Sequence, residues 1–190
     1  LQAGIVADLV RAGVAIHVFN QRDVAGILAM IRTLGSIIGA AERADQLAAG
    51  FEARLAGIAS TSRPQPKPKV YFEEWDDPLI SGIGWVSELI EIAGGEDALP
   101  KLRLQQAARD RIISPDVVRE AAPDVILASW CGKKVVPDRI RKRTELVRNI
   151  MERLLAADGS CIIIEPALQE TSRELLMVRD GIADGGLHVY

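Results

Sequence analysis

Acidic and aromatic side chains are concentrated in one stretch of the chain, residues 69–99. An apolar run at residues 70–72, rich in β-forming side chains, predicts a buried strand. Candidate site residues follow this strand directly: Glu73, Glu74, Trp75, Asp76 and Asp77. Ligands of open α/β sheets bind beyond the carboxyl ends of the strands. The pattern therefore predicts a ligand-binding turn between this strand and the helix that begins near Trp85.

The four carboxylates of this turn allow four interpretations. They can bind a cation, form an acid–base pair, or line a ligand cleft together with Trp75 and Trp85. Adjacent side chains of a strand point to opposite faces, so at most two of the acids converge. We favour the lining of a cleft over a catalytic pair, and a solvated turn is the remaining interpretation. Trp130 and Lys133 follow a second predicted strand at residues 125–128, which opens on the same edge of the sheet.

Other residues of catalytic type do not form a recognisable motif. His17 and His188 are the only histidines, and both lie within strand patterns that favour core or strand-end positions. The sequence has no nucleophile elbow, no phosphate-binding Gly-rich loop and no Cys-x-x-Cys pair. Cys131 and Cys161 fit burial as small hydrophobic residues better than a metal site, and whether they pair stays open. We therefore expect a binding protein, not an enzyme, with no metal and no resident cofactor.

The composition is that of a globular protein, with 190 residues, 48% hydrophobic side chains and a net charge of −3. This length is sufficient for one full domain or two small lobes. The charge gives no reason to expect a nucleic-acid partner. No apolar run approaches the roughly 20 residues that a membrane-spanning helix needs. The chain begins without Met in a helical pattern, so we expect a fragment or a mature form whose signal segment is not included.

Alternating helix and strand patterns predict an α/β fold. A helix is expected at residues 1–12, a buried strand at 14–19, and helices over 23–59 with breaks at Gly35 and Gly39. Together, the helices of residues 23–59 could extend over roughly 50 Å and reach between two lobes. The predicted segments are residues 1–22 (remnant of an N-terminal lobe), 23–60 (long inter-lobe helical segment), 61–69 (Pro-rich connector), 70–143 (C-terminal α/β lobe) and 144–190 (divergent α/β tail).

Two strings carry a family resemblance: residues 73–97 (EEWDDPLISGIGWVSELIEIAGGED) and residues 115–134 (PDVVREAAPDVILASWCGKK). They closely resemble cobalamin-type substrate-binding proteins of ABC importers, within the wider iron-siderophore, haem and cobalamin class. Residues 1–39 fit the end of that family's N-terminal lobe and its inter-lobe helix, so the resemblance covers about residues 1–141. It implies two Rossmann-like lobes joined by a long helix, the N-terminal lobe being truncated here. The ligand would lie in the cleft between the lobes.

The resemblance also implies a function. The protein would capture cobalamin, or alternatively haem or an iron-siderophore complex, as a monomer in the periplasm or as a lipid-anchored protein at the cell surface. It would then deliver the ligand to the permease of an ABC importer. Glu73, Glu74, Trp75 and Trp130 match positions at the cleft edge of the C-terminal lobe.

Docking on the permease is a second implication of the resemblance, since the family uses one acidic residue per lobe that meets arginines of the permease. Asp116, at the start of a helix with Pro115 at its first position, matches the residue of the C-terminal lobe. Glu120 is the nearest substitute.

Residues 144–176 carry a different resemblance, to the late part of a class I S-adenosylmethionine-dependent methyltransferase of the ribosomal small-subunit type. Glu165 and Pro166 would then lie near the substrate side. The Gly-rich cofactor loop of that class has no counterpart in the sequence. The alternatives to a binding protein are therefore a methyltransferase-related chain and a truncated α/β domain without surviving activity. Residues 187–190 predict the start of a further strand.

Overall fold

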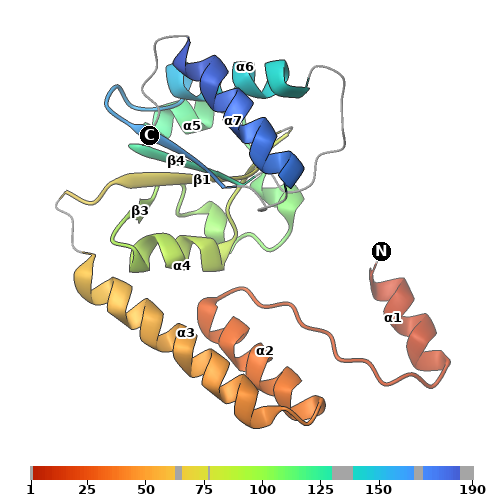
Figure 1. The fold of residues 1–190 in the computed structure, drawn as a ribbon. Helices are drawn as coiled ribbons and strands as arrows, with labels where there is room; N and C mark the ends of the chain where they lie inside the picture. The colour runs from red at the N-terminus through yellow and green to blue at the C-terminus, as the bar shows by residue number, and fades with distance from the viewer. Residues whose placement is uncertain (1, 63–65, 77, 130–138, 165–168, 185–190) are drawn as a thin grey trace. The chain divides into compact units, whose positions relative to one another are not determined.

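Three parallel strands form the centre of the fold (Figure 1): β1 (Lys69–Asp76), β4 (Val125–Ser129) and β5 (Ser160–Ile164). Tyr71 of β1 pairs with Ile126 of β4, which pairs in turn with Cys161 of β5. Two short strands add to β1, the antiparallel β2 (Leu79–Ser81) and the parallel β3 (Glu96–Asp97). The strand order is β2-β1-β4-β5, with β3 also paired to β1. The predicted α/β class is confirmed.

The computed structural model describes residues 2–62, 66–76, 78–129, 139–164 and 169–184. The chain divides into two compact units, Leu1–Ala49 and Gly50–Tyr190, each of which is considered by itself. The strand predicted at residues 187–190 lies outside the described residues. The segment boundaries at residues 22, 60, 69 and 143 stay predictions.

Asp124 joins the beginnings of all three parallel strands. Its carboxylate accepts a hydrogen bond from the Lys69 backbone N–H at 2.8 Å. Its backbone N–H donates to the Lys69 carbonyl at 2.9 Å, and its carbonyl accepts from the Ser160 N–H at 2.8 Å. Because one residue bonds to two neighbouring strands, it fixes their register with respect to β4.

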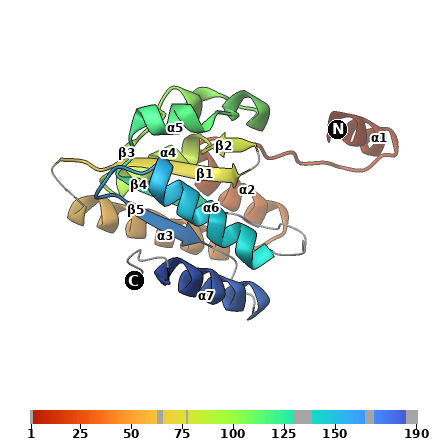
Figure 2. The same cartoon turned by 90° about the horizontal axis from the view of Figure 1, so that it is seen from above.

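Three helices cover one face of the sheet (Figures 1 and 2): α5 (Pro115–Ala121), α6 (Arg139–Arg153) and α7 (Gln169–Ala183). Arg148 on α6 donates to the Gly181 carbonyl on α7 at 3.1 Å, and Arg143 pairs with Glu174 at 3.5 Å. The core between these helices and the sheet consists of buried apolar side chains: Tyr71, Val118, Ile126, Ala128, Val147, Ile150, Leu154, Val178 and Ile182. Helices α6 and α7 and strand β5 are therefore part of the same sheet and core as β1.

Helix α4 (Gly84–Ile92) lies on the other side of the sheet (Figure 1). A Cβ added to Gly82, just before this helix, would lie 3.2 Å from Cδ1 of Phe72 in β1 and 3.4 Å from Cγ1 of Val86 in α4. The helix ends before Gly94, which has a φ of 89°, a conformation that glycine adopts readily. Two short 3₁₀ helices follow, η1 (Leu102–Leu104) and η2 (Ala108–Arg111), in the stretch that the sequence pattern indicates as a loop.

The first unit consists of helices α1 (Gln2–Arg11) and α2 (Val24–Ile37) and the beginning of α3 (Ala41–Thr61). The break between α2 and α3 falls at Gly39, one of the two predicted positions, which has a φ of 74°. The other, Gly35, stays inside α2, where an added Cβ would lie only 2.2 Å from that of Ala44. Because α3 packs back against α2 here, the two helices do not continue as one rod over residues 23–59.

The strand predicted at residues 14–19 is not formed. These residues are neither helix nor strand, His17 is exposed, and Val14 and Val18 are 48% and 66% exposed. A strand needs a neighbour to satisfy its backbone N–H and C=O groups. The described part of the first unit contains helices but no strand that could supply one. An apolar run alone was therefore insufficient, and the prediction of a buried strand with a core histidine was wrong.

Gly159 tests the close approach of the α6–β5 turn to Asp124. A Cβ at this position would lie 2.5 Å from the Leu155 Cγ and 2.8 Å from the Asp124 carbonyl oxygen. We expect Gly159→Ala to lower the free energy of unfolding by about 1–3 kcal/mol, since the backbone of Asp124 has to shift. Chemical denaturation measures this difference.

Gly57→Ala is the matched control, because Gly57 lies in α3 and no atom comes within 4 Å of its added Cβ. This change is expected to stabilise the helix by roughly 0.5–1 kcal/mol. Equal effects of the two substitutions would contradict the close packing at Gly159.

A substitution at Tyr71 tests how the burial of its phenol beneath α5–α7 affects stability. Its hydroxyl has no hydrogen-bond partner among the residues that the structure describes. Burial, and secondarily the charge of Glu73, raise the pKa of Tyr71 well above its ordinary value. The unfolded chain releases this proton near pH 10 whereas the folded chain retains it, so the stabilisation is present below pH 10 and is lost as the pH rises further.

We expect Tyr71→Phe to raise the free energy of unfolding by up to about 1 kcal/mol at pH 7 and to weaken its decrease above pH 10. Denaturation curves at pH 7 and at about pH 10.5 measure both effects. Tyr190→Phe, which changes the chain's other tyrosine, is the control for loss of a phenol. An unchanged alkaline decrease in Tyr71→Phe would show that the phenol ionises in the folded state.

Candidate ligand-binding site

Strand β1 continues through the residues that the sequence pattern placed in a turn. Glu73, Glu74 and Trp75 belong to β1, which ends at Asp76 and forms an antiparallel hairpin with β2. Glu73 pairs with Ser81 and Trp75 pairs with Ile80, so the register breaks at Glu74. An irregularity of this kind bends the strand and changes the direction of the side chains that follow. The expectation of a turn beginning at Glu73 was therefore wrong.

Glu73 lies inside the core. Its side chain is 0% exposed, and it is two residues from the buried Tyr71 on the same strand. Burial, and secondarily the charge of Glu73, raise the pKa of the Cys161 thiol to about 11. Cys161 is a half-buried free thiol, and Cys131 lies outside the described residues. A ligand could reach Glu73 only if the helix-covered face opened, so its role in binding stays a prediction.

Glu74 has the opposite environment, with a side chain that is 40% exposed and an ion pair on one side. Its Oε2 atom lies 2.6 Å from Nη1 of Arg111, whose side chain is only 3% exposed. The same nitrogen of Arg111 also donates to the Ser81 carbonyl at the end of β2. Arg111 thus connects η2 to both strands of the hairpin.

Sequence reasoning missed Arg111. It is separated from Glu74 by 37 positions, in a stretch that the pattern indicates as a polar loop. Two further arginines, Arg103 and Arg109, lie in the same stretch, and no spacing distinguishes Arg111 from them. The one signal in the sequence was the nearby Ile113, which continues the apolar pattern. In the structure, its backbone N–H donates to the Leu79 carbonyl at 3.0 Å.

The two tryptophans of the prediction come from adjacent elements. Trp75 is half-buried near the carboxyl end of β1, and Trp85 is half-buried in the first turn of α4. Asp76 ends β1, but its side chain lies outside the described residues. Trp130 and Lys133 lie outside them as well.

The structure thus brings Glu74 and Trp75 to the carboxyl edge of the sheet. Since β1 and β4 run parallel, their ends lie at the same edge.

Both residues predicted to dock on a permease are exposed on α5. Asp116 lies in the first turn of this helix, where its charge interacts favourably with the helix dipole. Its Oδ1 atom is 2.7 Å from Nη1 of Arg119, in an ion pair whose two side chains are both mostly exposed. Such a pair contributes little and can exchange partners readily. Docking through Asp116 or Glu120 stays a prediction.

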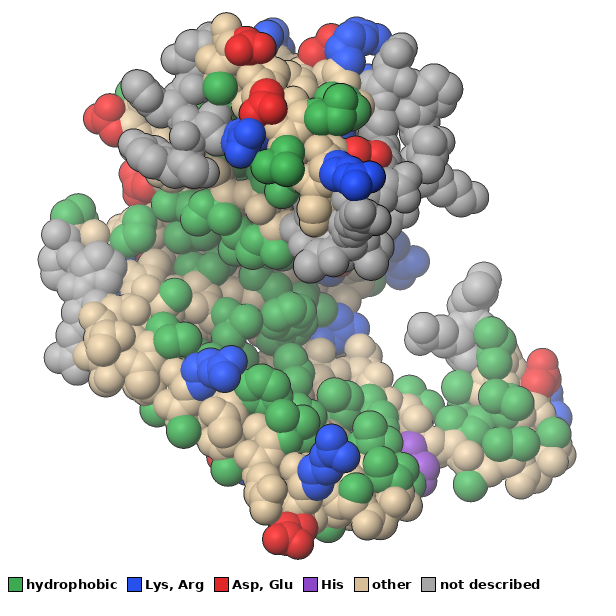
Figure 3. Space-filling view, in the orientation of Figure 1, with side chains coloured by type: hydrophobic (Ala, Val, Ile, Leu, Met, Phe, Trp, Pro, Cys, Tyr) green, Lys and Arg blue, Asp and Glu red, His purple; other side chains and the backbone are tan. Residues whose placement is uncertain are grey.

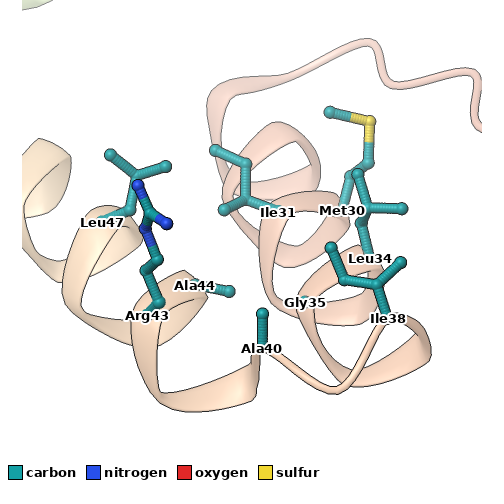
Figure 4. A pocket seen from close by; sticks show the side chains of 9 residues that line it. All are labelled: Met30, Ile31, Leu34, Gly35, Ile38, Ala40, Arg43, Ala44 and Leu47. Carbon is teal, nitrogen blue, oxygen red and sulfur yellow. The ribbon is translucent and has the colours of Figure 1, made fainter.

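An apolar groove in the first unit was not predicted (Figures 3 and 4). Figure 3 shows hydrophobic side chains gathered over α2 and α3, and Figure 4 shows the residues around the groove. Its volume is about 340 Å³, and its lining consists of Met30, Ile31, Leu34, Gly35, Ile38, Ala40, Arg43, Ala44 and Leu47. Arg43 is the single charged residue of that lining.

The described part of the chain contains no candidate metal site and no candidate membrane-spanning helix. No group of three or more His, Cys, Asp or Glu side chains there is arranged to hold a metal ion. None of the helices described combines the length and the apolar character needed to cross a membrane.

Comparisons with solved structures find several similar folds. The periplasmic haem-binding protein RhuT of Roseiflexus sp. RS-1, in its apo form, matches with a TM-score of 0.65 and 21% identity, over 93% of this chain and 71% of that one. An ABC transporter substrate-binding protein of Listeria monocytogenes EGD-e matches with a TM-score of 0.65 and 15% identity, over 96% and 73%. A periplasmic haem-binding protein of Pseudomonas aeruginosa matches with a TM-score of 0.62 and 17% identity, over 95% and 68%.

The resemblance of residues 144–176 to a methyltransferase gains no support from these matches. The matches cover 93% to 96% of this chain. Strand β5 and helix α7 belong to the same sheet and core as β1. A comparison with curated protein sequences finds no match.

A family model described as periplasmic binding protein matches residues 7–151. The match begins in α1 and ends in α6, and so includes the hairpin with Glu74 and Trp75. The chain belongs to the periplasmic binding protein family.

Proposed function

We propose that this chain is the substrate-binding component of an ABC importer and captures a flat metal chelate of the tetrapyrrole class, cobalamin or haem. Family membership supports the first part of the proposal. The second part rests on the sequence resemblance to cobalamin-type proteins and on the similar structures, several of which are described as haem-binding. The chelate is the cargo of transport and not a resident cofactor.

The observation that carries the proposal is that an aromatic and an acidic residue both lie at the carboxyl edge of the sheet. Trp75 lies in β1 next to Glu74, at the edge where β4 also ends. A corrin or porphyrin ring is a broad apolar plate that favours aromatic side chains, with a few polar groups to fix its orientation. Trp85, in the first turn of α4, is the second aromatic candidate near this hairpin.

Delivery to the permease would use the exposed surface of α5. Asp116 is the proposed docking residue and Glu120 its substitute, each meeting an arginine of the permease. Capture would take place outside the cytoplasm, in the periplasm or at the cell surface.

Ligand titration tests the proposal. Cyanocobalamin or haem is expected to quench tryptophan fluorescence saturably and to release or absorb heat in calorimetry. Trp75→Ala is expected to weaken binding about tenfold or more, because a stacked aromatic side chain is worth about 1.5 kcal/mol beyond the area that it buries. Trp85→Ala gives the matched comparison for the second tryptophan.

S-adenosylmethionine is the negative control, and we expect it not to bind. The absence of quenching and of heat with both chelates, up to about a millimolar (a binding free energy near −4 kcal/mol), would contradict the proposed function. Binding of S-adenosylmethionine in their place would support the methyltransferase interpretation.

A further inference from the structure

The ion pair between Glu74 and Arg111 holds one oxygen of Glu74 and leaves the other available. Oε2 lies 2.6 Å from Arg111, while Oε1 has no hydrogen-bond partner among the residues that the structure describes. The Glu74 side chain is 40% exposed, so solvent or a ligand can reach it. A carboxylate with one oxygen fixed by a charge-assisted hydrogen bond presents its second oxygen as an oriented acceptor.

Burying the guanidinium group of Arg111 costs free energy, so stabilising the hairpin is a poor explanation for it. Its side chain is 3% exposed, and its Nε has no hydrogen-bond partner in the described part of the chain. A buried ion pair is often no more stabilising than apolar residues of similar size, whereas a buried cation without its partner is strongly destabilising. The hairpin has other ties in the same place, including the bridge between Ile80 and Ile112. Stability alone therefore accounts poorly for an arginine here.

We propose that Arg111 is a positioning residue that fixes Glu74 as an ionised hydrogen-bond acceptor for the ligand at the carboxyl edge of the sheet. This inference rests on the proposed function and narrows its ligand class. An oriented carboxylate accepts hydrogen bonds from N–H and O–H donors and repels carboxylates. The favoured chelate therefore carries peripheral amide groups, as the corrin of cobalamin does, and not the two propionates of haem.

Arg111 also balances the charge of Glu74 on the Oε2 side, while Oε1 still presents its lone pairs at the edge. Without it, the carboxylate would be free to rotate and would contribute an unbalanced negative charge to the edge. Both hydrogen bonds of Arg111 with the described residues come from one nitrogen, Nη1, which donates to Glu74 and to the Ser81 carbonyl. A lysine ammonium can donate to two acceptors in the same way, so Arg111→Lys is expected to retain most of the function.

A double-mutant cycle with cyanocobalamin as the probe tests this relation. We expect Glu74→Gln and Arg111→Met each to weaken binding about tenfold, and the double variant to be little weaker than either one, since Arg111 acts through Glu74. Arg111→Lys should bind within about threefold of the unchanged chain. Additive losses in the double variant would overturn the inference, because Arg111 would then act on binding independently of Glu74.

Haem as a second probe separates positioning from general damage. Glu74→Gln leaves the cation of Arg111 uncompensated, so binding of the propionates should be retained or strengthened while binding of cyanocobalamin falls. Parallel losses for both probes would indicate a merely structural role and overturn the inference. If Arg111→Met does not fold, Glu74→Gln decides alone, because the glutamine side chain has the same shape and its amide oxygen can still accept the hydrogen bond from Arg111.

Arg103→Met is the matched control. Arg103 pairs with Glu91 between η1 and α4, in a second Arg–Glu contact of the same unit. We expect it to leave both affinities unchanged, within about twofold, because exposed ion pairs contribute little.

The outcomes distinguish this inference from the proposed function. An unchanged chain that binds neither probe contradicts both. A chain that binds haem but not cyanocobalamin overturns the inference about amide donors and leaves the proposed function standing.

Discussion

The register of three parallel strands is the constraint on which the rest of this fold depends. Asp124 sets it, because the side chain and backbone of this residue bond to Lys69 at the beginning of β1 and to Ser160 at the beginning of β5. A one-residue shift would turn Tyr71 and Ile126 away from the helices α5–α7 and remove the buried core. With the beginnings of the strands fixed, the ends of β1 and β4 necessarily reach one edge together. The hydrogen bonds of Asp124 at the beginnings of the strands therefore also determine which strand ends lie together at the carboxyl edge.

Glu73 and Glu74 are adjacent in β1, but their side chains lie in different environments. Glu73 faces the buried core, where burial, and secondarily the charge of Glu73, raise the pKa values of Tyr71 and Cys161. Glu74 is partly exposed and paired with Arg111. The alternation of a strand separates the two, and the irregular register at Glu74 accompanies the change. The carboxylate at the surface is therefore the one suited to contact a ligand.

Much of the fold could be predicted because the relevant signals are local. Short apolar runs indicated β1 and β4, and Pro115 indicated the beginning of α5. The segment at residues 14–19 failed because the formation of a strand depends on a partner strand, which no local pattern reveals. The polar residues from Glu73 to Asp76 predict a turn, but they continue β1 because β2 pairs with them in a hairpin.

The candidate site was less predictable than the fold. The burial of Glu73 had a signal in the sequence, since it lies two positions after Tyr71 and shares its face of the strand. Arg111 had only the indirect signal of the neighbouring apolar Ile113, because its contact with Glu74 depends on how η2 packs against the hairpin. Long-range pairs of charged residues are specified by the fold and not by their spacing. The comparisons could identify the family, whereas this contact required the structure.

Hydrogen–deuterium exchange with and without cyanocobalamin tests the central claim most directly, that the ligand binds at the carboxyl edge of β1. The account predicts slower exchange of backbone amides over residues 74–86, which include the β1–β2 hairpin and the first turn of α4. Amides of α6 and α7, on the helix-covered face, should change little. Protection confined to α6 and α7, with none over residues 74–86, would contradict the account.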